Sequence, residues 1–323
     1  MTGRVLVRGA GVAGLAAARE LCRHGLAVEL RERAASPGAG ASGLAGGMLA
    51  PFCEGESAPE AVTRLGLRAA DWWEEALPGL VGRAGTLVLA PPRDAAELTR
   101  FAARTSGHEW LDADGIAALE PALAGRFGKG LFFRQEAHLD PRAALAGLRA
   151  RLEREGARLR FGTPDEGDAG GFDAVIDCTG AAAIPARPGL RGVRGEMLYL
   201  ETPEIAFARP VRLLHPRHPI YVVPRGQGRF MVGATMIEAN DAGPVSARSL
   251  MELLNTAYAL HPAFGEARVC ETGAGVRPAY DDNLPRVTRQ DRTIHINGFY
   301  RHGFLLAPAL ARQAVECLTG RAS

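Results

Sequence analysis

Apolar residues follow two different periods along the chain, and each period predicts its own kind of secondary structure. The apolar run at residues 5–7 predicts a buried strand, and apolar residues then recur at helical spacing over 12–22 until Gly25, which can cap the helix. A second strand is predicted at residues 27–33. This order of strand, helix and strand is typical of a parallel sheet with helical crossovers, so we predict a fold of the α/β (α+β) class.

Past Gly189 the pattern changes to alternation and turns. Residues 195–200, 219–224 and 229–234 predict antiparallel strands, with a hairpin turn at 226–228. Further helices are predicted over 59–77, 94–106, 142–155, 247–260 and 308–318, and further strands over 85–90, 174–180 and 294–298. The C-terminal region therefore returns to the strand, glycine turn and helix of the first residues, which indicates a discontinuous domain.

The predicted elements divide the chain into two domains. A Rossmann-type domain comprises residues 1–82, 128–184 and 270–323, and an inserted antiparallel-sheet domain for the substrate comprises 83–127 and 185–269. The chain has 323 residues, of which 47% are hydrophobic and 23% charged, so it is long enough to bury two cores.

Three glycines at the first turn predict a dinucleotide site. Gly9 permits the tight turn, Gly11 lets a phosphate approach the backbone, and Gly14 lets the helix lie close to the strand. Glu32 ends the second strand 18 residues after Gly14, where such a carboxylate accepts hydrogen bonds from ribose hydroxyls. The alternative is a glycine-rich turn and a surface glutamate. Arg8 departs from the pattern, because an apolar residue usually ends the first strand.

Small residues dominate the segment that follows, residues 34–51, which includes five glycines. Backbone with small side chains can press against a flat cofactor, and we prefer this interpretation to a low-complexity linker, which would more often carry polar residues.

Composition restricts the partners and the compartment. The net charge of +2 is small and its residues are evenly mixed, which argues against nucleic acid or an anionic membrane as a partner. The five cysteines form no CxxC pair and are expected to be unpaired thiols in a reducing cytoplasm. No apolar run approaches the ~20 residues that span a bilayer, and the first strand leaves no room for a signal peptide, so we expect a cytoplasmic protein without membrane insertion.

Seven motifs in order make the chain similar to the D-amino acid oxidase family of flavoproteins, and within it to the glycine oxidases of thiamine biosynthesis. The motifs occupy residues 9–14, 45–49, 139–142, 221–225, 233–236, 275–278 and 298–308. The resemblance runs nearly from end to end. It implies bound FAD in the Rossmann-type domain, and it implies that dimers or tetramers are common, so a homo-oligomer is expected.

The resemblance also implies which residues hold FAD. The pyrophosphate, the ribose, the isoalloxazine ring and its pyrimidine end are expected at Gly9, Gly11, Val12, Ala13, Gly14, Glu32, Arg33, Ser42, Gly46, Gly47, Met48, Leu49, His302, Gly303, Phe304 and Leu305. His302 is interpreted as a structural residue of its turn by default, with a place in the pocket wall as the alternative. We expect no covalent link to the flavin, because residues 277–280 occupy the region where related sarcosine oxidases carry the linking cysteine and Cys270 lies too early.

A carboxylate-binding arginine is required for any enzyme that acts on small amino acids, because a guanidinium grips a carboxylate through two parallel hydrogen bonds. Arg277 matches that residue of the family, with a surface ion pair as the alternative. Tyr221 matches the tyrosine that supports the same carboxylate, although a core tyrosine would have the same pattern. Met236 would line the pocket, and Arg301 would add positive potential near substrate and flavin.

These residues suggest oxidative deamination of glycine, sarcosine or a small D-amino acid. Hydride transfer to flavin N5 would give an imine for thiazole synthesis, and dioxygen would reoxidise the flavin with release of hydrogen peroxide. No residue beyond the flavin itself is expected to be catalytic. Two alternatives stay open: a dehydrogenase or cyanide-synthase-like subunit with an acceptor other than oxygen, and a non-catalytic module that binds FAD or an amino acid. The short connection 158–172 replaces a longer strand pair and leaves the adenine contacts undefined.

Overall fold

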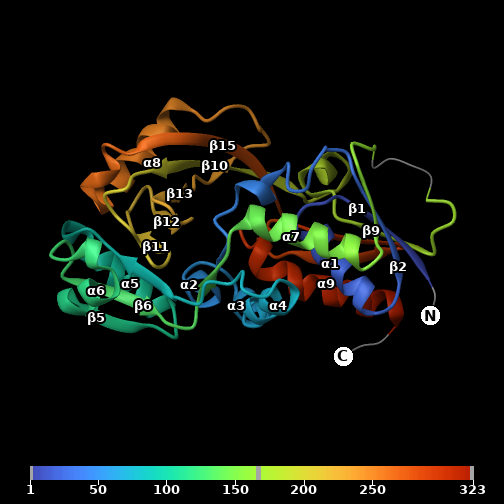
Figure 1. Cartoon of the computed structure of the whole chain (residues 1–323), viewed down its shortest axis with the longest axis horizontal. Helices are drawn as coiled ribbons and strands as arrows, with labels where there is room; N and C mark the ends of the chain where they lie inside the picture. Colours follow the sequence, from blue (N-terminus) through green and yellow to red (C-terminus); the bar gives the residue numbers. More distant parts are fainter. Residues whose placement is uncertain (1–2, 165–168, 321–323) are drawn as a thin grey trace.

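The computed structural model describes residues 3–164 and 169–320 and contains two large sheets (Figure 1). The first sheet has the strand order β16-β17-β9-β1-β2-β8. Its strands are β1 (Arg4–Arg8), β2 (Ala27–Glu32), β8 (Arg158–Phe161), β9 (Ala174–Asp177), β16 (Arg286–Gln290) and β17 (Thr293–Asn297). All neighbours are parallel except β16 and β17, which confirms the predicted α/β fold.

Helices α1 (Val12–Arg23), α7 (Pro141–Arg154) and α9 (Gly303–Thr319) cover this sheet and share one core with it (Figure 1). The predicted cap is confirmed at the end of α1, where Gly25 has a φ of +72°. Asp140 caps α7, since its side chain accepts hydrogen bonds from the N–H groups of Arg142 and Ala143.

The helix predicted over residues 59–77 is two helices, α3 (Glu60–Gly66) and α4 (Ala69–Ala76). Gly66 ends the first of them against α9, where a Cβ atom would lie 2.7 Å from the Leu305 side chain. The chain needs a glycine at this close approach. Because glycine is a poor helix former, the helix breaks here, although the periodic apolar pattern continues past the break.

Helix α9 begins at Gly303, five residues before the predicted start at Pro308. A proline inside a helix leaves the carbonyl four residues earlier without its usual donor. Here the freed carbonyl of Phe304 accepts a hydrogen bond of 2.9 Å from the indole Nε1 of Trp73. Because this partner comes from α4, which is distant in the sequence, the helix continues through a residue that we expected to start it.

The second sheet is largely antiparallel and has the order β14-β10-β13-β12-β11-β4-β6-β5, with β15 paired to β10. Its strands are β4 (Thr86–Leu89), β5 (Glu109–Asp112), β6 (Lys129–Phe133), β10 (Arg191–Glu201), β11 (Val211–Leu213), β12 (Ile220–Pro224), β13 (Arg229–Gly233), β14 (Ile237–Glu238) and β15 (Arg268–Ala279). The predicted antiparallel strands and the hairpin between β12 and β13 are confirmed. The long strand β15 and the short strand β16 were not expected from the sequence.

Helix α8 (Ala247–Leu260) packs on this sheet through Leu253, Ala257 and Leu260, while α5 (Ala95–Arg104) and α6 (Ala113–Leu119) lie near β5 and β6 (Figure 1). Strand β6 pairs with β4 and strand β15 with β10, so both belong to the second sheet. The residues of β6 and most residues of β15 nevertheless fall within 128–184 and 270–323, the ranges predicted for the Rossmann-type domain. The division of the chain into two domains stays a proposal.

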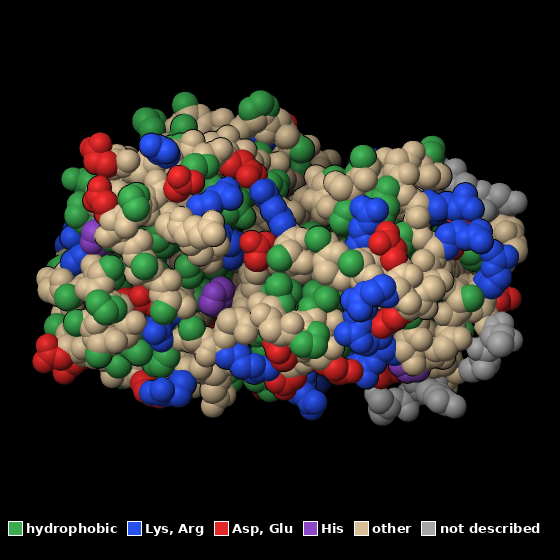
Figure 2. Space-filling view, in the orientation of Figure 1, with side chains coloured by type: hydrophobic (Ala, Val, Ile, Leu, Met, Phe, Trp, Pro, Cys, Tyr) green, Lys and Arg blue, Asp and Glu red, His purple; other side chains and the backbone are tan. Residues whose placement is uncertain are grey.

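A small sheet lies between the two large ones. It consists of β3 (Met48–Leu49) and β7 (Ala137–His138), and α2 (Pro51–Glu54) follows β3 directly. Acidic and basic side chains are interspersed over the face of the molecule in Figure 2, as the small net charge suggests. Among residues 3–164 and 169–320, no helix is both long and apolar enough to cross a bilayer.

Candidate active site

The start of α1 presents bare backbone. Gly9 has a φ of +92°, and a Cβ atom there would lie 2.5 Å from the carbonyl oxygen of Cys178 at the end of β9. A Cβ atom on Gly14 would overlap the Gly9 carbonyl. The loop and the helix therefore pack closely, as predicted, and the N–H groups of the first turn of α1 lie at the positive end of its dipole.

Two side chains surround this helix start. Ser42 accepts a hydrogen bond of 3.1 Å from the N–H of Val12. Glu32, at the end of β2, accepts one from Ala10 N–H at 2.7 Å and one from Ala34 N–H at 2.9 Å. Each Glu32 oxygen has a second lone pair, so the carboxylate is fixed next to the glycine loop and can still accept a hydroxyl.

The segment at β3 is bare backbone as well. A Cβ atom on Gly46 would lie 2.5 Å from the Tyr221 ring, and Gly47 has a φ of +72° that favours glycine. Arg225 donates a hydrogen bond of 2.7 Å to the Gly46 carbonyl. Residues 46–49, which include Met48 and Leu49, are thus held from the side of the second sheet, and no large side chain separates the Gly46 backbone from Tyr221.

The start of α9 meets the start of α1. A Cβ atom on Gly303 would lie 3.3 Å from Cγ1 of Val12, so the two helix N-termini are neighbours. Phe304 and Leu305 point into the core, where Phe304 stacks on Trp73. Only the backbone of these residues is available to a ligand at this end of α9.

The arrangement fits a dinucleotide cofactor such as FAD. The glycine loop, residues 46–49 and the N-terminus of α9 come from distant parts of the sequence and lie close together. In addition, the buried Nδ1 of His302 has no hydrogen-bond partner within the part of the chain that the structure describes. Bare backbone, a helix N-terminus and an unpaired polar atom are what a phosphate and a flat heterocycle require.

Arg277 lies on β15 and is partly buried. Its Nη1 donates a hydrogen bond of 3.0 Å to the carbonyl of Thr235. No carboxylate within residues 3–164 and 169–320 forms an ion pair with it. Gly195 on the neighbouring strand β10 makes room for it, because a Cβ atom there would overlap the guanidinium. Burial, and the nearby charge of Arg301, lower the pKa of Arg277.

Tyr221 on β12 lies between Gly46 and Gly233, with its ring against both. Burial raises the pKa of Tyr221 above its usual value, so its hydroxyl keeps its proton and remains a hydrogen-bond donor. Met236 is 49% exposed, and its sulfur accepts a hydrogen bond of 3.1 Å from the Tyr300 hydroxyl. Arg301 Nη1 lies 3.7 Å from the same sulfur, so Met236 and Arg301 are adjacent.

Glu54, the last residue of α2, binds the other cationic side chains and was not identified from the sequence. Its Oε2 lies 2.8 Å from Arg301 Nη2 and 2.8 Å from His302 Nε2, and Oε1 lies 3.8 Å from Arg212 Nη1. Burial alone would raise the pKa of Glu54, but Arg301, His302 and Arg212 hold it well below the usual range. Glu54 is therefore an ionised carboxylate with cationic partners.

Thr235 and Glu196 form a second group that sequence reasoning missed. Thr235 donates its hydroxyl to Glu196 at 3.1 Å, while its carbonyl accepts from Arg277. Arg194 donates to Glu196 at 2.8 Å. Arg194 and Glu196 are two residues apart on β10, but the contacts of Thr235 with Glu196 and Arg277 join distant parts of the sequence, so residue spacing does not indicate them. For Glu54 one signal exists: it is the first charged residue after Arg33, at the end of the segment of small residues.

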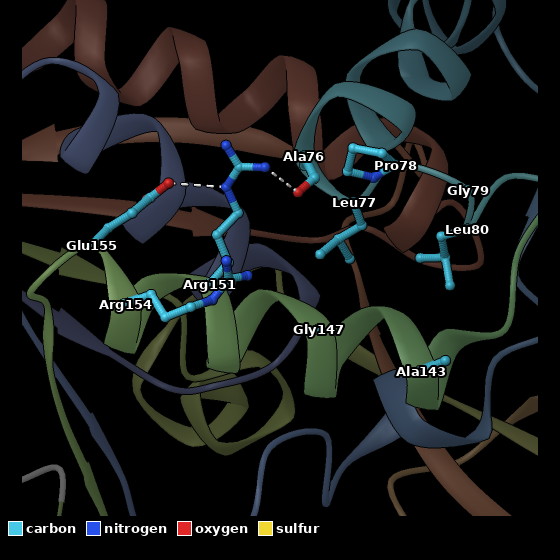
Figure 3. A pocket seen from close by; sticks show the side chains of 10 residues that line it. All are labelled: Ala76, Leu77, Pro78, Gly79, Leu80, Ala143, Gly147, Arg151, Arg154 and Glu155. Atoms are coloured by element: carbon cyan, nitrogen blue, oxygen red, sulfur yellow. Dashed lines mark hydrogen bonds and ion pairs between the residues drawn. The ribbon is translucent and has the colours of Figure 1, made fainter.

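A surface hollow of about 610 Å³ lies elsewhere, between α7 and residues 76–80 (Figure 3). It contains none of the predicted site residues. One of its two arginines, Arg151, is already bound to Glu155 and to the carbonyls of Glu75 and Ala76.

Known proteins similar to this chain include flavoenzymes. A model of the DAO family, described as FAD dependent oxidoreductase, matches residues 4–317. A protein of Rhizobium etli, provisionally named thiamine biosynthesis oxidoreductase ThiO, is 68% identical over 315 residues, which are 98% of this chain and 96% of that protein. A glycine oxidase of Bacillus licheniformis is 30% identical over 240 residues, 66% of this chain and 63% of its own.

The fold agrees with a solved structure. The crystal structure of glycine oxidase from Geobacillus kaustophilus superposes with a TM-score of 0.81 at 24% identity, and the match covers 100% of this chain and 96% of that one.

Proposed function

Because the chain belongs to the DAO family of FAD dependent oxidoreductases, we propose that it oxidises the carbon–nitrogen bond of glycine or another small amino acid. One observation carries this proposal. Arg277 is a partly buried guanidinium that lacks a carboxylate partner among the described residues, and the Tyr221 side chain, whose ring lies against Gly46, is near enough to influence its pKa. A partly buried cation without a counter-ion is costly to the fold, and a substrate carboxylate would supply the missing charge.

FAD is the cofactor, and we propose that it is held without a covalent bond. Residues 9–14 and Ser42 would hold the pyrophosphate, Glu32 would accept the ribose hydroxyls, and residues 46–49 and 302–305 would border the flavin ring. Arg33 would complete the site beside Glu32. When bound, FAD supplies a hydride acceptor that dioxygen can regenerate with release of hydrogen peroxide.

The protein residues in this proposal bind and orient the substrate. Arg277 grips the carboxylate through two hydrogen bonds, and the protonated Tyr221 hydroxyl donates a third. Met236 lines the pocket, and Arg301 contributes positive potential. An amino acid with a neutral amine then needs no protein base, so orientation is the main contribution of the chain.

The names of the relatives support glycine as the substrate and thiamine biosynthesis as the pathway. We propose that the imine from glycine feeds synthesis of the thiazole ring.

The experiment is a spectrum of the purified protein before and after anaerobic glycine, followed by air and a peroxide assay. We expect the flavin absorbance to bleach with glycine and to recover in air with one peroxide per flavin. Bleaching without recovery in air would indicate that the flavin passes its electrons to an acceptor other than oxygen. A flavin that no small amino acid bleaches would contradict the proposal.

A further inference from the structure

We propose that Glu54 determines the substrate range of this pocket by restricting it to amines that carry a single carboxylate. This inference rests on the proposed function of the same site. It concerns a residue outside the set that the sequence predicts to contact the substrate, and it commits to one chemical class, monocarboxylic amines, against dicarboxylic amines such as iminodiacetate or D-aspartate.

The partners of the two arginines in the pocket differ. Arg301 forms an ion pair of 2.8 Å with Glu54 and a hydrogen bond of 2.9 Å with the Ser57 hydroxyl. Arg277 forms only the hydrogen bond to the Thr235 carbonyl among the interactions of the described residues. One guanidinium is therefore already neutralised by the protein, and one is available to an anion.

The two guanidinium groups belong to a single pocket. Arg277 donates to the carbonyl of Thr235, and Arg301 Nη1 lies 3.7 Å from the sulfur of the next residue, Met236, which is predicted to line the pocket. The two guanidinium groups therefore approach the same short segment, and the positive charge of Arg301 contributes to the lowered pKa of Arg277. A substrate bound to Arg277 would therefore direct its remaining atoms toward Arg301 and its partner.

Charge decides which remaining atoms are accepted. The α-carboxylate of a monocarboxylic substrate neutralises Arg277, and nothing else in such a substrate competes with Glu54. A second carboxylate would approach Arg301 and meet the carboxylate of Glu54, which holds the same cation and cannot leave without breaking its bond to His302 as well. Like charges in a partly buried site repel strongly, so the second carboxylate is rejected.

The predicted effect of removing this charge is specific. Glu54→Gln has nearly the same shape and can still accept hydrogen bonds from Arg301 and His302, but it leaves Arg301 as a second available cation. We expect the affinity for malonate relative to acetate to rise at least tenfold, which corresponds to about 1.4 kcal/mol. The ratio of kcat/KM for iminodiacetate over glycine should rise in the same direction.

The test is titration calorimetry of the FAD-loaded enzyme with acetate and with malonate, which bind without turnover. Wild type, Glu54→Gln and Glu54→Asp are compared with the control Glu109→Gln. This control removes the negative charge of Glu109, on β5, from its exposed ion pair with Arg134. Glu54→Asp keeps the charge and should keep the wild-type preference for acetate, and so should Glu109→Gln. A changed preference in Glu54→Asp would assign the effect to shape and overturn the proposal.

The remaining outcomes separate the two proposals. An unchanged ratio of malonate to acetate affinity in Glu54→Gln would overturn the role of Glu54 while leaving glycine oxidation by the wild type intact. A wild type that prefers malonate to acetate would also overturn it. If the wild type binds acetate but oxidises no glycine, the proposed reaction fails, and the calorimetric ratio still decides whether Glu54 selects the number of carboxylates.

Discussion

Arg277 and Arg301 lie in one pocket and differ in what the protein gives them. Arg301, at the turn before α9, has Glu54 and Ser57 as partners, whereas Arg277 on β15 has a single backbone carbonyl. The same contrast holds for two acids at α2. Glu54 is surrounded by cations, while Glu136 accepts a hydrogen bond from the Cys53 N–H and forms no ion pair with any residue that the structure describes. Arg301 and Glu54 therefore neutralise each other within the fold. Among the described residues, Arg277 lacks an acidic partner and Glu136 lacks a basic one.

The largest effect is expected from the unpaired arginine. Arg277→Ala should lower kcat/KM for glycine about 10²–10³-fold, mainly through KM, because the charge-assisted hydrogen bonds to the carboxylate are lost. FAD content, measured by absorbance, should stay at the wild-type level, since Arg277 is not among the residues placed at the cofactor. The exposed Arg134→Ala serves as the control and should leave the kinetics unchanged. An unchanged KM in Arg277→Ala would contradict the claim that Arg277, unlike Arg301, is available to the substrate carboxylate.

The second effect concerns the unpaired acid. Burial raises the pKa of Glu136 to about 7, with a smaller contribution from the charge of Glu54. An acid whose pKa is higher in the folded than in the unfolded protein favours folding at low pH, and this contribution is lost as the pH rises from about 4.5 through 7. Glu136→Gln should therefore match the wild type near pH 5 and exceed its free energy of unfolding by about 2–3 kcal/mol at pH 8.

Urea unfolding of the FAD-loaded proteins at the two pH values measures this difference. A Glu136→Gln protein that gains nothing at pH 8 would show that Glu136 has a counter-ion or water that its contacts do not reveal.

The smallest effect is expected from a substitution that displaces the Arg277 guanidinium instead of removing it. Gly195→Ala places a Cβ atom where the Arg277 guanidinium lies, so the arginine must shift away from the Thr235 carbonyl. We expect KM for glycine to rise about tenfold with kcat less affected, because orientation of the carboxylate is impaired while the charge remains. Steady-state kinetics test this, with Gly79→Ala as a control, since nothing lies within 4 Å of a Cβ atom there. Although Gly79 has a positive φ, it lies far from β15 in sequence and should affect stability rather than KM.

Local patterns predicted much of this molecule. The glycine loop, the cap of α1, the hairpin between β12 and β13 and the α/β class follow from residues that are close in the sequence, so their spacing was sufficient. The start of α9 was predicted too late because its proline is tolerated through Trp73, a residue of another helix. The single helix at 59–77 was wrong because Leu305 requires Gly66 at the break.

The site was predictable where a motif identified a residue and unpredictable where a residue acts through a distant partner. Arg277, Tyr221 and Met236 lie in motifs of the family. Glu54 and His302 are 248 positions apart, and only the fold brings them together. Charge pairing between such positions leaves no periodic trace in one sequence, so the contrast between the two arginines became visible only with the structure.

The most direct measurement of the central claim is the rate of flavin bleaching when the FAD-loaded enzyme is mixed with glycine without oxygen, in the wild type and in Arg277→Lys. Lysine keeps the charge but cannot form the paired hydrogen bonds of a guanidinium. We predict that the wild type bleaches with saturation in glycine and that Arg277→Lys needs at least tenfold more glycine for half-saturation. Equal half-saturation in the two proteins, or no bleaching of the wild type by glycine, would contradict the claim that Arg277 binds the carboxylate of the substrate.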